Sequence, residues 1–203
     1  MPGHGAQDLF PLTYIVRHGQ TDWNVEGRLQ GQADTDINTL GRQQADRNGA
    51  KLRELIQRPD EFDFVASPLR RTCETMERIR SGMGLPARGY RTDPLLKEVH
   101  FGDWQGFTHA ELEAANPGCT EGRSSNKWRF MPPGRDAESY EKMSLRMKTF
   151  LDKLNGPTVC VTHGGIIRAV FHLIGGLDGD EAAAMDVPQD RILRLSDGKL
   201  EWL

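Results

Sequence analysis

Two histidines stand in similar surroundings, each after a short apolar segment and directly before a glycine. His18 lies between Arg17 and Gly19, and His163 precedes Gly164. A neutral imidazole is nucleophilic near pH 7, and an adjacent arginine can bind phosphate oxygens through parallel hydrogen bonds. Glycine at the next position lets the backbone approach a ligand closely. The pattern predicts phosphoryl transfer, with His18 attacking phosphorus and His163 donating a hydrogen bond to the phosphate.

Phosphoryl transfer also needs further cations around the phosphate oxygens and an acid that protonates the leaving oxygen. The adjacent Arg70 and Arg71 follow a strand-like segment and would point about 100° apart on a helix, so only one of them can face the site. Glu98 is the predicted acid, because a carboxyl group among apolar side chains such as Leu96 and Phe101 keeps its proton more readily. These residues complete a candidate set for the reaction.

Strand-like and helical segments alternate along the chain, as expected for an α/β sandwich with a largely parallel central sheet. The strand-like runs and the closing hairpin cover residues 12–16, 62–66, 158–162 and 192–203. Helical patterns cover residues 45–56, 67–81 with Ser67-Pro68 as the helix start, 108–115, 140–154 and 165–175. Ligands of such sheets bind beyond the carboxyl ends of the strands, and both histidines lie there.

Four sequence blocks resemble, in the correct order, the histidine phosphatase superfamily in its phosphoglycerate-mutase-like group, branch 1. They are Arg17-His18-Gly19-Gln20-Thr21 with Trp23-Asn24 and Gly27-Arg28-Leu29-Gln30-Gly31, Ser67-Pro68-Leu69 with Arg71 and Thr75, Leu96 and Glu98 with Phe101-Gly102, and Val161-Thr162-His163-Gly164-Gly165-Ile166-Ile167-Arg168. The resemblance spans nearly the whole chain and selects Arg71 over Arg70. It implies a three-layer α/β/α sandwich with a mostly parallel mixed central sheet.

The resemblance also implies a role for each matched residue. His18 would form a phosphohistidine, Glu98 would protonate the leaving group, and Arg17, Arg71 and His163 would surround the phosphate. The implied substrate contacts are Gly19, Asn24, Gln30, Gly31 and Gly164. No cofactor is implied, and no metal either, since the histidines lack metal-ligand spacing. The chain departs from the family at Gln105, where many relatives carry glutamate, and in the longer segment 134–139, so the rim of the pocket is expected to differ.

The fate of the phosphohistidine separates three functions. A mutase must shield it from water, but the residues after His163 are taken up by a helix, a loop and the closing hairpin. The preferred prediction is therefore a metal-independent phosphatase of a small phosphorylated metabolite, and the alternative is a cofactor-dependent phosphoglycerate mutase. A catalytically inactive relative that binds phosphorylated ligands or proteins is the third reading, which the intact His18, Arg71, Glu98 and His163 disfavour.

Composition limits the class of protein. The 203 residues are 37% hydrophobic and 27% charged with a net charge of −3, values typical of one globular domain without a nucleic-acid or acidic-membrane partner. Residues 1–11 are expected to be a flexible N-terminal segment, and 12–203 a single domain with a lid at about 107–138. No secretory signal or run of roughly 20 apolar residues is present, which predicts a cytoplasmic protein. The sequence leaves the oligomeric state open.

The remaining reactive residues are interpreted mostly as structural. In the lid, a second acidic group of the substrate could be reached by three cations, although charges in a loop are more often solvated: Lys127, Arg129 and Arg135. The other histidines are interpreted as surface or core residues: His4, His100, His109 and His172. The three cysteines are too scattered for a disulfide framework or a zinc site: Cys73, Cys119 and Cys160.

Overall fold

The computed structural model describes residues 10–203, so most of the segment expected to be flexible, 1–11, lies outside the described residues. One six-stranded mixed sheet has the order β3-β2-β4-β1-β5-β6. Four strands run parallel: β1 (Thr13–Arg17), β2 (Asp63–Ala66), β3 (Arg91–Thr92) and β4 (Thr158–Thr162). The antiparallel strands are β5 (Ile192–Ser196), which pairs with β1, and β6 (Lys199–Trp202), which completes the predicted hairpin.

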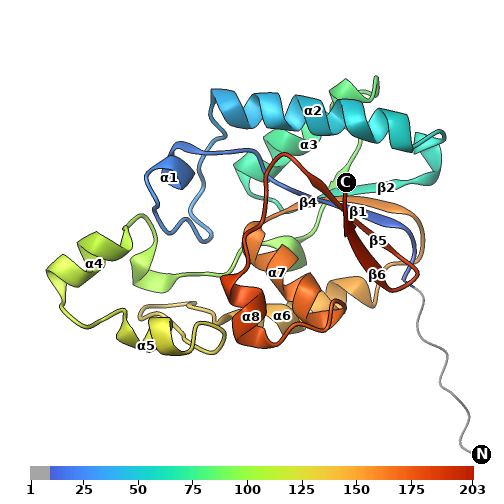
Figure 1. Ribbon diagram of the computed structural model, residues 1–203. Coiled ribbons are helices and arrows are strands. Elements are labelled where there is room, and N and C mark those ends of the chain that lie inside the picture. The colour runs from blue at the N-terminus through green and yellow to red at the C-terminus, as the bar shows by residue number, and fades with distance from the viewer. Residues whose placement is uncertain (1–9) are drawn as a thin grey trace, which may run out of the picture.

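Helices cover both faces of the sheet (Figure 1). One face packs against α2 (Thr39–Leu55) and α3 (Arg70–Gly82), and the other against α6 (Tyr140–Leu151), α7 (Gly164–Leu173) and α8 (Gly179–Ala184). Alternate strand residues feed two separate cores: Ile15 and Cys160 lie in the core beneath α6 and α7, whereas Val16 and Val161 lie in the core beneath α2 and α3. The predicted three-layer α/β/α sandwich is confirmed.

Short helices extend from the edge of the sheet where the parallel strands end (Figure 1). They are α1 (Asp22–Val25), α4 (His109–Ala115) and α5 (Glu121–Ser125), with the 3-10 turns η2 (Pro94–Leu96) and η3 (Gly102–Trp104) nearby and η1 (Pro59–Glu61) before β2. A capping box starts α4: Thr108 Oγ1 accepts a hydrogen bond from the Glu111 amide, and the Glu111 carboxylate accepts one from the Thr108 amide. Within residues 10–203, no helix has the length and apolar character needed to cross a membrane.

Several helix boundaries differ from the prediction. The helix expected over 45–56 already begins at Thr39, and the one expected over 165–175 ends at Leu173. The helix expected to start at Ser67-Pro68 begins at Arg70, because Leu69 is still extended and no side chain caps the helix. The Ser67 hydroxyl, which the pattern assigned to the helix start, contacts the ring of His163 instead. Helix α6, expected over 140–154, ends at Leu151.

Candidate active site

Three neighbouring parallel strands end at the same edge of the sheet, so the residues that directly follow them lie close together. β1, β4 and β2 are followed directly by His18, His163 and Ser67. The rings of His18 and His163 lie 5.2 Å apart between centroids, inclined at 60°. Ser67 Oγ lies 2.8 Å from Nε2 of His163. The sheet therefore brings the two predicted histidines together at its carboxyl edge.

His18 is held as a neutral imidazole with a defined tautomer. Its side chain is buried, and Nδ1 lies 2.8 Å from the carbonyl oxygen of Gly19. A carbonyl oxygen only accepts hydrogen bonds, so Nδ1 carries the proton and Nε2 keeps a free lone pair. Burial, followed by the positive charges of Arg71 and Arg17, lowers the pKa of His18 well below its ordinary 6.5. The ring can thus act as a nucleophile through Nε2 at neutral pH.

The turn that carries His18 is fixed by α3 and by the start of α2. The Gly19 amide donates to Thr75 Oγ1 on α3 at 3.1 Å. A Cβ atom on Gly19 would lie 2.2 Å from the carbonyl oxygen of Gly41 in the first turn of α2. Position 19 must therefore be glycine for the two backbone segments to pack this closely. The close backbone approach that the sequence assigned to a phosphate ligand is made, in this structure, to Gly41.

Two arginines face this histidine, the half-buried Arg17 and the buried Arg71, and neither has a carboxylate partner within residues 10–203. Arg71 is fully buried and donates to the carbonyl oxygens of Gly31 and Ala33 at 2.7 Å each, while Arg17 Nη1 donates to that of Val187 at 2.6 Å. In residues 10–203 the Nε of each has no hydrogen-bond partner. Burial lowers both pKa values to about 10, so both side chains stay cationic at neutral pH. Buried cations without a counterion favour an anionic ligand.

Glu98 lies against the N-terminus of α7. Its Oε2 accepts a hydrogen bond from the Gly165 amide at 3.0 Å, and its Oε1 accepts one from the Val99 amide at 2.9 Å. A Cβ atom on Gly165 would lie 2.1 Å from Glu98 Oε1, so α7 needs glycine there to leave room for the carboxyl group. The apolar residues expected around Glu98 are buried nearby, but the direct polar contacts of its carboxyl group are backbone amides.

His163 is the second histidine of the site. It is fully buried, packs against His18, and has no hydrogen-bond partner for Nδ1 among the described residues. Burial, followed by the charge of Arg71, lowers its pKa well below 6.5, so its ring is neutral in the free protein. A neutral ring still has one N–H to donate.

Most of the predicted residues line a cavity of about 230 Å³. Its lining includes Arg17, His18, Asn24, Gln30, Gly31, Arg71 and Glu98. Gly19, His163 and Gly164 are not part of this lining; they lie in the strand-to-helix turns behind it. Arg70 is exposed and pairs with Asp36 at 2.8 Å, so Arg71 is the arginine that faces the cavity.

The family model of the histidine phosphatase superfamily (branch 1) matches residues 13–201. The chain belongs to this superfamily. It is 35% identical to glucosyl-3-phosphoglycerate phosphatase of Mycobacterium tuberculosis over 77% of this chain and 71% of the relative. It is 37% identical to phosphoglycerate mutase-like protein 4 of Arabidopsis thaliana over 77% of this chain and 68% of the relative. The structure of a mycobacterial glucosyl-3-phosphoglycerate phosphatase complexed with VO3 superimposes with a TM-score of 0.76 at 31% identity, covering 95% of this chain and 96% of the other.

Several lining residues were given no role in the predicted site, although some of them belong to the matched sequence blocks. They are Arg28, Leu29, Phe101, Arg123, Tyr140 and Arg168. Arg168 lies four residues after Gly164 on α7, and that helical spacing could have placed it on the side of the site. Of the three lid cations considered, Lys127 lines the cavity, whereas Arg129 pairs with Glu141 at 3.1 Å and Arg135 is not part of the lining.

The two departures from the superfamily pattern lie behind the cavity rather than in its lining. Gln105 Oε1 accepts a hydrogen bond from the Gln32 amide at 2.6 Å. Glu138, in the long segment 134–139, forms a half-buried ion pair with Arg146 of α6 at 3.0 Å. Arg146 in turn donates to the carbonyl oxygen of Glu98 at 2.9 Å. Both departures therefore support the walls of the site.

Proposed function

We propose that this chain is a metal-independent phosphomonoesterase that hydrolyses a small phosphorylated metabolite through a phosphohistidine at His18. The observation that carries the proposal is a neutral, buried imidazole with a free Nε2 beside Arg17 and Arg71, neither of which has a counterion among the described residues. The related phosphatase of Mycobacterium tuberculosis supports a hydrolase. Asn24, Gln30 and Gly31 in the lining, with Gly19 and Gly164 behind it, are the proposed substrate contacts.

In the first step, Nε2 of His18 attacks phosphorus. The new N–P bond forms as the P–O bond to the alcohol breaks, and the departing oxygen takes a proton from Glu98. Arg17 and Arg71 neutralise the charge on the peripheral phosphate oxygens, and His163 donates its single N–H. Fixed charges in a site that excludes water stabilise such a transition state strongly.

In the second step, water attacks the phosphohistidine. The Glu98 carboxylate takes one proton from that water, a new P–O bond forms, and the N–P bond to His18 breaks. Inorganic phosphate leaves, and His18 and Glu98 return to their starting states. Proton transfer of this kind contributes about 10² to 10⁴ in rate.

The first test is hydrolysis of 4-nitrophenyl phosphate in the presence of EDTA. His18→Asn should lower kcat by at least about 10³-fold, because no other side chain supplies the nucleophile. His172→Asn is the matched control, since His172 lies outside the cavity lining. A phosphoryl group on His18 should be found by mass spectrometry of the rapidly quenched wild type. Equal rates from wild type and His18→Asn would remove the enzymatic proposal.

A mutase is the second candidate, because one relative at 37% identity is named a phosphoglycerate mutase-like protein. The two reactions share the phosphohistidine and differ in which acceptor takes the phosphoryl group. Incubation with 3-phosphoglycerate, with and without 2,3-bisphosphoglycerate, separates them. We expect inorganic phosphate to be released faster than 2-phosphoglycerate forms, and primed isomerisation faster than hydrolysis would replace the phosphatase proposal.

A further inference from the structure

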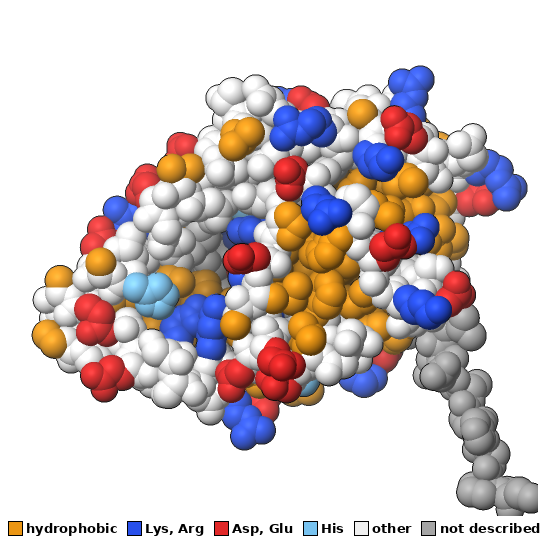
Figure 2. All heavy atoms as spheres, viewed as in Figure 1, with side chains coloured by type: hydrophobic (Ala, Val, Ile, Leu, Met, Phe, Trp, Pro, Cys, Tyr) orange, Lys and Arg blue, Asp and Glu red, His pale blue; other side chains and the backbone are white. Residues whose placement is uncertain are grey.

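A second pocket of about 430 Å³ adjoins the active-site cavity on the side of α4 and α5. We call it the outer pocket; its lining is His109, Arg123, Ser124, Ser125, Lys127, Asp180 and Ala184. Arg123 and Lys127 line both spaces and therefore stand at their junction. Figure 2 shows this side of the molecule hollowed, with basic side chains inside and at the rim. The hollow is larger than a phosphoryl group alone requires.

Arg123 is an unusual residue for a lid. Its side chain is only 8% exposed, and in residues 10–203 its guanidinium forms no ion pair, while its Nε has no hydrogen-bond partner. The guanidinium lies 5.5 Å from the ring centre of Phe101, a contact that does not neutralise its charge. Arg28, another lining arginine, is instead neutralised by Glu26 and Glu111. A buried cation without a counterion is costly unless a ligand compensates it.

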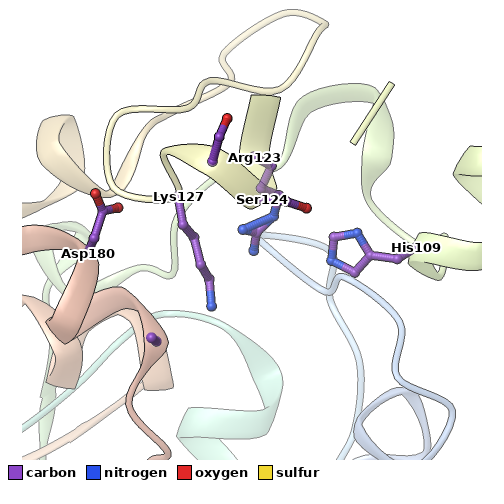
Figure 3. Close-up of a pocket in the computed structure, with 7 residues that line it drawn as sticks. His109, Arg123, Ser124, Lys127 and Asp180 are labelled. Carbon is purple, nitrogen blue, oxygen red and sulfur yellow. The ribbon is translucent and has the colours of Figure 1, made fainter. Parts of the chain in front are cut away.

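A second cation shares the junction. Figure 3 shows the side chains of Arg123 and Lys127 directed into the same space, with His109 on one side and Asp180 on the other. Burial and the charges of Arg168 and Arg123 lower the pKa of Lys127 to about 8, so it is still mainly protonated at pH 7. Asp180 accepts a hydrogen bond from the Trp128 amide at 3.1 Å. The junction therefore combines two cations, and no carboxylate from the described residues 10–203 is bonded to either.

We propose that Arg123 and Lys127 bind a second anionic group of the substrate, a carboxylate or a second phosphoryl group, while the reacting phosphoryl group occupies the inner cavity. The proposal rests on the proposed function and specifies its substrate class: phosphomonoesters that carry a second acidic group. The rest of a polar substrate would extend into the outer pocket, where the serine hydroxyls, His109 and Asp180 offer hydrogen bonds.

The test compares three substrates that differ in one group: 3-phosphoglycerate with a carboxylate, glycerol 1,3-bisphosphate with a second phosphoryl group, and glycerol 3-phosphate with neither. We expect wild type to prefer one of the two diacidic esters over glycerol 3-phosphate in kcat/KM. Arg123→Met should lower that preference by about 10- to 100-fold, because a charged hydrogen bond is lost. Whichever diacidic ester is preferred identifies the second anion.

Two further variants make the result specific. Lys127→Met should lower the same preference by about 10-fold, and it tests the site independently if Arg123→Met does not fold. Arg129→Met is the matched control, because Arg129 is a lid cation that is exposed, paired with Glu141 and outside both linings. The control should keep the wild-type preference.

Failure of this inference is separable from failure of the proposed function. An unchanged preference in Arg123→Met and Lys127→Met, with hydrolysis intact, would overturn the second anion site alone. If wild type hydrolyses none of the esters and no 4-nitrophenyl phosphate, the proposed function fails. Calorimetric binding of 3-phosphoglycerate and glycerol 3-phosphate to wild type and Arg123→Met then decides the site, and equal affinity ratios in both proteins would overturn it.

Discussion

Among individual residues, His18 depends on one hydrogen bond to direct its reactive nitrogen. The bond from Nδ1 to the Gly19 carbonyl oxygen leaves Nε2 as the nitrogen with a lone pair. Gln189, which sequence reasoning missed, donates to the carbonyl oxygen of His18 at 3.1 Å and to Asn24 Oδ1 at 3.1 Å. Backbone and side chain of the nucleophile are thus both fixed before any ligand arrives, which favours a rapid attack.

The first prediction concerns the protonation of His18. Because burial and two arginines lower its pKa well below 6.5, His18 should remain neutral with its proton on Nδ1 between pH 8 and pH 6.5. Nitrogen-15 NMR of the imidazoles should show no titration of this ring in that range, with the signal assigned by its loss in His18→Asn. A protonation midpoint at or above 6.5 would contradict the neutral nucleophile.

At the level of the elements, α6 fixes the segment that carries Glu98. Arg146 on α6 donates to the carbonyl oxygens of Leu95 and Glu98 at 2.7 and 2.9 Å, and also binds the Glu138 carboxylate. Glu138 accepts a further hydrogen bond from the His100 amide at 3.1 Å. The Arg146–Glu138 pair therefore connects α6 to both sides of the proposed acid without touching the cavity.

This arrangement makes Arg146 a positioning residue for Glu98. Arg146→Met should slow hydrolysis of an alkyl phosphate by about 10-fold more than hydrolysis of 4-nitrophenyl phosphate, because an alkoxide needs the proton from Glu98 and 4-nitrophenolate needs it much less. The readout is the ratio of the two kcat values. Arg42→Met, which removes an Arg–Glu pair between α2 and α3, is the matched control. An equal loss on both substrates would mean that Arg146 has only a structural role.

The elements also show how far local sequence patterns reach. Strands 158–162 and 62–66 were predicted nearly correctly, because a buried parallel strand is marked by its own apolar run. The predicted start of α3 was wrong, because the Ser67 hydroxyl contacts His163, a residue far away in sequence, instead of capping the helix. The lid was predicted only as a segment. Tertiary packing pairs Arg129 with Glu141 and leaves Arg123 without a counterion in the described part of the chain, and local sequence patterns encode neither outcome.

For the whole molecule, the charge around the active-site cavity is opposite in sign to the net charge of the chain. The chain has a net charge of −3, yet the half-buried Arg17 and the buried Arg71 and Arg123 line one cavity without a carboxylate partner in the described part of the chain. Such cations destabilise the free protein, since their desolvation is not offset by a counterion. The two cores on either side of the sheet must compensate for this cost. Binding of an anion should therefore stabilise the entire fold.

The last prediction measures that coupling with inorganic phosphate. A ligand that binds only the folded state adds about 2.7 kcal/mol to the free energy of unfolding at 100 times its Kd. Arg71→Met should lose most of this gain at the same phosphate concentration, because a charged hydrogen bond contributes about 1.5 to 3 kcal/mol. Arg70→Met is the matched control, since Arg70 is adjacent in sequence but exposed and paired with Asp36. Urea unfolding with and without phosphate supplies the values, and an equal gain in the Arg71 and Arg70 variants would show that phosphate binds outside the cavity.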